Sequence, residues 1–188
     1  IRDSTGTDLV EWQLRVASGQ PLPLRQEQLA IHGHAIEARL YAEDADRGFL
    51  PSTGTLRRLR LPTPSAHVRV DTGVEEGDSI TPYYDPMIAK LIVWDVDRDA
   101  ALRRMSQALA DCQVVGVTTN SGFLRRLVNT DSFAHAKLDT ALIEREQAAL
   151  SAVGDTDDAL WLLAAVAAVA STGGASTDAR DPHSCLLY

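Results

Sequence analysis

The amino-acid sequence predicts an α+β domain, in which an antiparallel sheet packs against helices and is followed by an apolar helix and a flexible tail. Segments with a two-residue hydrophobic period gather between residues 35 and 94, whereas segments with a helical period follow from residue 97. Glycines and prolines interrupt the chain between the strand segments, as short connections require. Strands that precede helices favour antiparallel pairing over alternating β-α-β units.

The first predicted element is a helix near the start of the chain. Thr7 is predicted to cap its first turn, which is rich in acidic residues that the helix dipole favours. Apolar side chains then recur with helical spacing at Leu9, Trp12 and Val16. Gly19 and the prolines after it predict the end of this helix.

Alternation predicts three strands in the middle of the chain. The strand over residues 35–42 has one apolar face and one polar face, the latter formed by Glu37, Arg39 and Tyr41. The same alternation predicts short strands over 58–61 and 67–71. A fourth strand, over 87–94, is almost continuously apolar, which predicts that it is covered on both faces.

The second half of the chain is predicted to be helical. Asp97 can cap a helix whose apolar stripe includes Leu102, Met105 and Leu109, and two more helices are predicted over 119–128 and 138–149. Thr156 and Asp157 are predicted to open a last helix that is apolar all round but shorter than the roughly 20 residues of a membrane span. We therefore expect this helix to dock against protein, and residues 171–181 to form a flexible linker.

Composition limits the classes of function. The net charge of −8 over 188 residues argues against binding to nucleic acid or to an anionic membrane surface. The two cysteines, Cys112 and Cys185, are in unrelated contexts, which argues against a disulfide framework and favours a reducing, cytoplasmic setting. The chain begins with Ile1 and has no signal-peptide layout, so we expect it to be a piece of a longer protein.

Common catalytic motifs are not found in the sequence. It has no phosphate-binding loop, dinucleotide-binding turn, serine nucleophile elbow or zinc-protease helix. If a nucleotide is used, most of its site is expected outside this chain. His32 and His34 share one face of an extended segment, but zinc needs at least one further ligand, so solvated or hydrogen-bonded histidines are favoured and no metal site is predicted.

Charged residues on the strands have plain structural interpretations when taken alone. Glu37 and Arg39 are neighbours on the polar face of their strand, where a structural ion pair is favoured over a catalytic role. Arg69 projects from the face opposite Val68 and Val70, before a glycine-bounded turn. By itself, such an arginine is most often a solvated or paired surface residue.

Several ordered motifs resemble the biotin carboxylases. The sequences GHAIEARLYAED at 33–44 and FLPSTG at 49–54 resemble the stretch that opens the C-terminal domain of that family. The sequences PYYDPMIAKL at 82–91, RDA at 98–100 and GVTTN at 116–120 are similar to later family motifs, and GTDLVEWQ at 6–13 resembles the helix that follows the ATP-grasp motifs. The resemblance extends from about residue 5 to residue 146.

The resemblance implies a reaction in which ATP and bicarbonate, with magnesium, carboxylate a ureido nitrogen of biotin before a carboxyltransferase transfers the carboxyl group. The metal-binding and bicarbonate-binding motif of the family is expected upstream of residue 1. A biotin-attachment Met-Lys-Met is not found, since the lysines are Lys90 and Lys137. We therefore expect the isolated chain to bind none of these cofactors and to be inactive.

The resemblance also implies roles for two residues. Arg69 matches the family arginine that faces bicarbonate and the biotin ureido oxygen, where a permanently charged guanidinium stabilises developing negative charge without exchanging a proton. Thr140 falls near the family contact to the adenine edge. Val115 departs from the acid found in some members.

Within the family, the residues in these motifs are most similar to those of the α subunit of 3-methylcrotonyl-CoA carboxylase, an enzyme of leucine degradation. This implies as partners the rest of the α subunit, with its ATP-grasp and biotin carrier domains, and a carboxyltransferase β subunit, to which the apolar helix would connect. The implied division is 1–29 for the end of the ATP-grasp region, 30–148 for the biotin carboxylase C-terminal domain and 149–188 for a linker and the start of the connecting domain.

Two alternatives remain open at this point. One is another biotin-dependent carboxylase, specific for acetyl-CoA, propionyl-CoA, pyruvate or urea. The other is a non-catalytic interaction module that recruits a partner through the helix containing Trp161.

Overall fold

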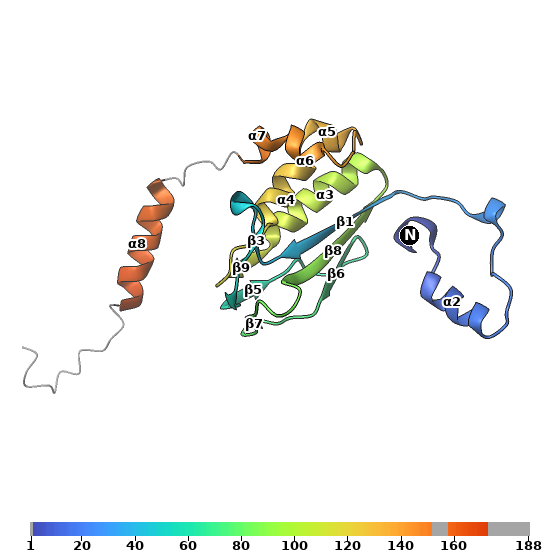
Figure 1. The fold of residues 1–188 in the computed structure, drawn as a ribbon, viewed down its shortest axis with the longest axis horizontal. Coiled ribbons are helices and arrows are strands. Elements are labelled where there is room, and N and C mark those ends of the chain that lie inside the picture. Colours follow the sequence, from blue (N-terminus) through green and yellow to red (C-terminus); the bar gives the residue numbers. More distant parts are fainter. Residues whose placement is uncertain (1, 152–157, 173–188) are drawn as a thin grey trace, which may run out of the picture. The chain divides into compact units, whose positions relative to one another are not determined.

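The computed structural model describes residues 2–151 and 158–172, which fall into two units divided after Ser151. Each unit is considered by itself. The first unit begins with the helices α1 (Arg2–Thr5) and α2 (Leu9–Ala17) and the 3-10 helix η1 (Gln26–Gln28). A mixed sheet and helix region follows, as the sequence predicts (Figure 1).

A three-stranded antiparallel sheet forms the centre of the first unit. Its order is β1 (His34–Tyr41), β8 (Met87–Asp95) and β6 (Val68–Thr72), so β8 is paired on both edges. Alternation predicts β1 and β6, and the continuous apolar run over 87–94 predicts β8. The expected burial of β8 on both faces is wrong: Leu91 and Val93 are fully buried, but Lys90, Ile92 and Trp94 on the other face are only partly covered.

Three two-stranded ribbons extend the sheet region. They are β2 (Glu43–Asp44) with β3 (Leu50–Pro51), β4 (Gly54–Thr55) with β7 (Ser79–Ile80), and β5 (Arg58–Arg60) with β9 (Gln113–Val115). A 3-10 helix, η2 (Ala45–Arg47), joins the two strands of the first ribbon. A second apolar core lies beneath these ribbons and contains Leu40, Ala42, Leu56, Ile80, Ile88 and Ala89.

The apolar face of the sheet packs against helices. Helix α3 (Arg98–Asp111) contacts β8 and β1, and α4 (Ser121–Val128) contacts α3 (Figure 1). The carboxylate of Asp97 accepts a hydrogen bond from the N–H of Ala100 at 2.7 Å, so the predicted N-cap is confirmed. The main core consists of side chains from both layers, including Ile36, Leu91, Val93, Leu102, Met105 and Leu109.

The side chain of Asn120, at the start of α4, is hydrogen-bonded to the outer edge of β1. Its side chain is buried, its Oδ1 accepts from the N–H of Tyr41 at 2.9 Å, and its Nδ2 donates to the carbonyl of Arg39 at 3.2 Å. The pairing register of β1 with β8 shifts between Leu40 and Tyr41. The amide thus satisfies backbone groups that an edge strand otherwise leaves unpaired.

Two predicted helix boundaries are wrong. Asp8, not Thr7, caps α2, because its carboxylate accepts from the N–H groups of Val10 and Glu11 at 3.1 Å each, whereas Thr7 is buried. The side chain of Thr7 instead hydrogen-bonds to that of Thr5.

The predicted helix over 138–149 is divided into α6 (Leu142–Arg145) and α7 (Gln147–Leu150), after the short α5 (Asp131–Ala134). The Asp139 carboxylate accepts from the N–H of Ala141 at 3.0 Å and from Arg145, which delays the start of the helix. Glu146, at the junction, accepts a hydrogen bond from the hydroxyl of Ser132. Local side-chain hydrogen bonds therefore compete with continuous helix here.

In the second unit, the structure describes helix α8 (Asp158–Thr172). The predicted opening residues Thr156 and Asp157, and residues 173–181 of the predicted linker, lie outside the described residues. The side chains of Trp161, Leu162 and Leu163 are about two-thirds exposed, at 65%, 68% and 66%. Of the helices in the described part of the chain, none has the length and apolar character needed to cross a membrane.

Candidate functional site

The polar face of the three-stranded sheet brings together charged residues from all three strands. The register places Ile92 between Glu37 on β1 and Arg69 on β6, and places Lys90 between Arg39 and Asp71 in the next row. All of these side chains project away from the face that packs on α3, because residues two apart in a strand share a face.

Arg69 and Asp71 form a two-pronged ion pair along β6. The Nε of Arg69 donates to Oδ1 of Asp71, and Nη2 donates to Oδ2, both at 2.9 Å. This geometry is the bidentate arrangement that orients a guanidinium most strongly. The hydrogen bond from Arg69 is the main cause that lowers the pKa of the Asp71 carboxyl, with a smaller contribution from Lys90. Asp71 is therefore ionised at neutral pH.

The predicted ion pair between Glu37 and Arg39 is also present, but it is looser. One Arg39 nitrogen, Nε, lies 3.4 Å from Oε1 of Glu37. A side-chain hydrogen bond with Tyr41, followed by the one with Glu37, raises the pKa of the Arg39 guanidinium. Each edge strand of the sheet thus holds its own acid and arginine at positions two apart.

An aromatic pair borders the charged rows at one end. The rings of His67 and Trp94 are stacked with centroids 5.4 Å apart, and Trp94 Nε1 donates to the carbonyl of His32 at 2.9 Å. A depression of about 420 Å³ lies beside Arg69 and is lined by Ser65, His67, Val68, Ile92 and Trp94. The guanidinium therefore borders a hollow that has apolar as well as polar walls.

Gly33 permits the close approach of the chain to this aromatic pair. Its φ is +68°, and a Cβ built there would lie 2.3 Å from the carbonyl oxygen of Asp95 and 2.6 Å from the Trp94 ring. Only glycine fits a left-handed backbone in contact with an indole at this distance. The glycine of the sequence GHAIEARLYAED therefore has a packing explanation.

The polar face carries a positive balance within an acidic chain. The two rows contain three cations, Arg39, Arg69 and Lys90, and two carboxylates, Glu37 and Asp71, whereas the whole chain has a net charge of −8. Such a local reversal of sign favours an anionic ligand over a cationic one. Arg69 is the most suitable contact for an oxyanion, because the Asp71 carboxylate fixes its guanidinium.

Other candidate residues lie elsewhere. The ring of His34 lies 3.0 Å from Nη1 of Arg98, so it is hydrogen-bonded, as expected. Burial raises the pKa of the Cys112 thiol to about 11, which makes it unreactive at neutral pH. Within residues 2–151 and 158–172, no three His, Cys, Asp or Glu side chains are grouped so that they could hold a metal ion.

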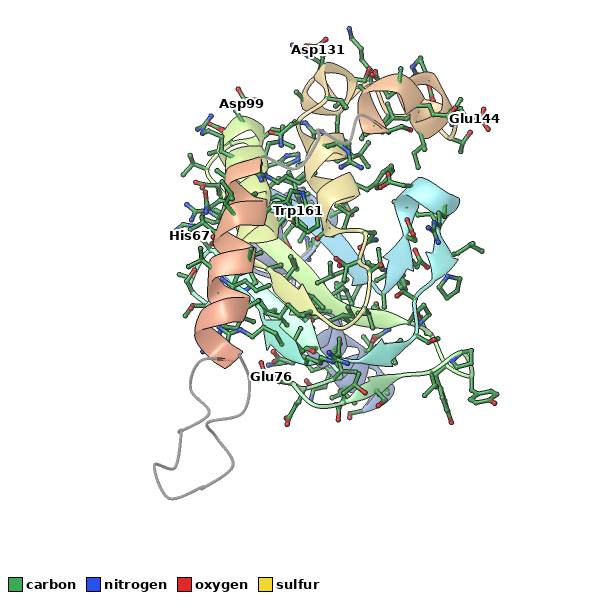
Figure 2. All side chains as sticks on the ribbon, turned by 90° about the vertical axis from the view of Figure 1, so that its left-hand side faces the viewer. His67, Glu76, Asp99, Asp131, Glu144 and Trp161 are labelled. Carbon is green, nitrogen blue, oxygen red and sulfur yellow. The ribbon has the colours of Figure 1, made fainter. Side chains whose placement is uncertain are left out.

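Thr140 is not brought close to Arg69. It lies in an exposed turn before α6, within the helical layer, whereas Arg69 projects from the opposite face of the sheet. Figure 2 shows Asp131 and Glu144, which flank Thr140 in the sequence, at one end of the unit and apart from His67. Val115 is exposed at the end of β9, where its backbone pairs with Arg58.

Comparison with known proteins identifies the class of domain. The family model described as "Biotin carboxylase C-terminal domain" matches residues 37–145, which include both rows of the polar face. The chain belongs to this family. Expectations drawn from the sequence motifs about family and fold are thus confirmed.

The curated relatives include methylcrotonoyl-CoA carboxylase α subunits and biotin carboxylases. The chain is 51% identical to the mitochondrial methylcrotonoyl-CoA carboxylase subunit alpha of Dictyostelium discoideum, over 85% of this chain and 23% of the relative. It is 55% identical to that of Oryza sativa subsp. japonica, over 76% and 19% respectively. A biotin carboxylase of Halalkalibacterium halodurans is 42% identical over 74% of the chain and 30% of the relative. The chain therefore spans less than a third of the relatives that it matches.

Solved structures agree with the fold. The biotin carboxylase domain of a thermophilic 2-oxoglutarate carboxylase bound to bicarbonate matches with a TM-score of 0.75 at 37% identity, over 81% of this chain and 34% of that one. The biotin carboxylase subunit of a pyruvate carboxylase matches with the same TM-score at 36% identity, over the same shares of the two chains.

Sequence reasoning missed Asp71. Its signal was available, because Asp71 stands two residues after Arg69, the same spacing that identified the pair of Glu37 and Arg39. Because residues two apart in a strand share one face, the sequence could have predicted an ion pair between Arg69 and Asp71.

Proposed function

We propose that this chain is the C-terminal part of the biotin carboxylase region in the α subunit of a methylcrotonoyl-CoA carboxylase. The observation that carries the proposal is the Arg69–Asp71 fork on a locally positive sheet face, in a chain about 50% identical to such subunits. The parent would carboxylate biotin with ATP, bicarbonate and magnesium. We propose that the isolated chain is inactive, since it spans only 19–23% of these two relatives.

Arg69 is proposed as the catalytic residue of this chain. Bicarbonate and ATP, when bound, supply the carboxyl group and the free energy that activates it. The guanidinium suits an oxyanion, because it is permanently charged, planar and 57% exposed beside the hollow. Arg69 would hold and orient the anion and would stabilise negative charge on the ureido oxygen without exchanging a proton. Among the described residues, no three His, Cys, Asp or Glu side chains are grouped so that they could bind magnesium. The magnesium ligands are therefore proposed to lie in another part of the parent.

Two finer assignments are part of the proposal. Thr140 would contact the adenine edge from its exposed turn, provided that the rest of the parent reaches the helical layer. The division into 1–29, 30–148 and 149–188 would separate the end of the ATP-grasp region, the biotin carboxylase C-terminal domain, and the linker with the start of the connecting domain. The end of the family match at residue 145 supports the proposed boundary after residue 148.

The partners are proposed to be the ATP-grasp and biotin carrier domains of the same subunit and a carboxyltransferase β subunit. Helix α8 supports the second partner, because large apolar side chains such as Trp161 and Leu162 are exposed on it within its own unit. Replacing both by polar residues in the full subunit should weaken assembly with the β subunit and leave carboxylation of free biotin intact. Loss of both activities would assign α8 to the catalytic region instead.

A cytoplasmic location, predicted from the cysteine content, stays a proposal. The names of the methylcrotonoyl-CoA carboxylase relatives place those proteins in mitochondria, so the mitochondrion is the alternative compartment. Fractionation of source cells, followed by immunodetection of the subunit, separates the two. Recovery with mitochondrial markers would overturn the cytoplasmic assignment.

The substrate is tested with the full-length parent, assembled with its β subunit. Carboxylation should be fastest with methylcrotonoyl-CoA when that substrate is compared with acetyl-CoA, propionyl-CoA, pyruvate and urea at equal concentration. A preference for one of the others would keep the biotin carboxylase assignment and reject the finer one. Absence of ATP-dependent and bicarbonate-dependent carboxylation of free biotin would reject both and favour a non-catalytic interaction module.

A further inference from the structure

The side chain of Arg69 is oriented by its ion pair with Asp71. Arg69 is 57% exposed, and a long, exposed arginine normally samples many rotamers. Here, two of its five N–H donors are bound to Asp71 along parallel 2.9 Å hydrogen bonds. The two parallel hydrogen bonds align the plane of the guanidinium with the Asp71 carboxylate.

Asp71 is itself held in place. It lies on the same strand as Arg69, opposite Lys90 on β8, and its side chain is less exposed than that of Arg69, at 37%. Lys90 lowers the pKa of the Asp71 carboxyl together with Arg69, so the acid stays charged. A charged, strand-anchored carboxylate is a suitable support for an arginine that must bind an anion.

The other acid on this face is not placed to do the same. Glu37 lies across Ile92 from Arg69, but its carboxylate is paired with Arg39 on its own strand. The opposite neighbour of Arg69 in the register is Ile92, which has no polar group. Of the two acids, Asp71 is therefore the one whose carboxylate is in a bidentate pair with Arg69.

We propose that Asp71 is a positioning residue that fixes the guanidinium of Arg69 for biotin carboxylation, an inference that rests on the proposed function. Asp71 does not touch the reacting atoms. It fixes the direction in which the arginine presents its donors. It also restricts the rotamers of the free arginine, so that less conformational entropy is lost when the anion binds.

The test is a double-mutant cycle in the full-length parent, assayed for carboxylation of free biotin. Asp71→Asn should lower kcat about 10-fold or more, the effect of loosening a catalytic group by a fraction of an ångström, and should leave the KM for ATP within about twofold. In an Arg69→Ala background, Asp71→Asn should have no further effect, because the group that it positions is gone. Asp71→Glu keeps the carboxylate and should restore part of the lost rate.

A matched control is the exposed pair on α2. There, Arg15 donates from Nε and Nη2 to Oε1 of Glu11 at 2.9 and 2.6 Å, and both side chains are about half exposed. Glu11→Gln removes the charge from a similar arginine pair and should leave kcat unchanged. A decrease of kcat as large as that of Asp71→Asn would overturn the proposal, because any surface ion pair would then suffice.

The remaining outcomes separate this inference from the function on which it rests. Normal kcat in a folded Arg69→Ala subunit would overturn the proposed role of Arg69 itself. Low kcat in Arg69→Ala with normal kcat in Asp71→Asn would overturn only the positioning role. An equal decrease caused by Asp71→Asn with and without Arg69 would also overturn it, since Asp71 would then act independently. Thermal melts of each variant identify losses that come from unfolding.

Discussion

Replacement of Asn120 tests how the edge of the sheet is held to the helical layer. The amide makes two hydrogen bonds to β1, to the N–H of Tyr41 at 2.9 Å and to the carbonyl of Arg39 at 3.2 Å. Asn120→Ala leaves both backbone groups without these partners, which costs about 1–3 kcal/mol for each group that water cannot reach. Because Arg39 is exposed and Tyr41 only partly buried, we expect the lower part of that range, about 2–3 kcal/mol in total.

Urea unfolding of the chain measures this loss. With slopes of about 1–3 kcal/mol per molar, the midpoint for Asn120→Ala should fall by about 1 M while the slope stays the same. Asn129→Ala is the control, because Asn129 is an exposed amide whose Nδ2 donates to Ser106 Oγ and to the carbonyl of Arg125. It should cost less than about 1 kcal/mol. Equal midpoints for the two variants would refute the role of Asn120.

Two further predictions concern stability. Gly33→Ala should destabilise the chain by at least about 2 kcal/mol in thermal melts, because its Cβ would clash with the carbonyl oxygen of Asp95 and with the Trp94 ring. Gly19 has a similar φ of +81° but open space around it, so Gly19→Ala should cost about 1 kcal/mol. Equal losses of stability in the two variants would show that the clash with Asp95 and Trp94 adds nothing to the cost of the left-handed backbone. The pKa of Asp71 is lowered in the folded chain, so its contribution to stability is present above about pH 4 and is lost as the pH falls through the folded-state pKa. The difference in urea midpoint between the wild type and Asp71→Asn should therefore shrink between pH 5 and pH 3, and a constant difference would contradict the assignment.

The strands were predictable because their burial follows their sequence. In β1 the buried residues are Ile36, Ala38 and Leu40, the positions that alternation predicts. Strand β9 was missed because three residues, of which only Val114 is partly buried, give no period to detect. Its pairing with β5 depends on contacts between segments more than 50 residues apart, which local patterns do not encode.

Helix boundaries and the site were less predictable, since both depend on side-chain hydrogen bonds. Asp8 and Thr7 are both good capping residues. Only the structure shows that the Asp8 carboxylate, and not the Thr7 hydroxyl, accepts from the N–H groups of the first turn. Arg69 was found through a family resemblance, because a strand arginine alone has no distinctive signal. The spacing of Arg69 and Asp71 could have indicated an ion pair, but its bidentate geometry follows only from the side-chain positions.

The most direct test of the central claim is the steady-state kinetics of Arg69 variants of the full-length parent, with free biotin as the acceptor. If the guanidinium stabilises charge that develops only during carboxylation, Arg69→Ala should lower kcat by about 100-fold or more and leave the KM for ATP nearly unchanged. Arg69→Lys keeps the charge but loses the planar fork, so it should recover only part of the rate. A well-folded Arg69→Ala subunit with normal kcat would contradict the account and leave the pair of Arg69 and Asp71 as a surface ion pair, with an effect on stability below about 1 kcal/mol.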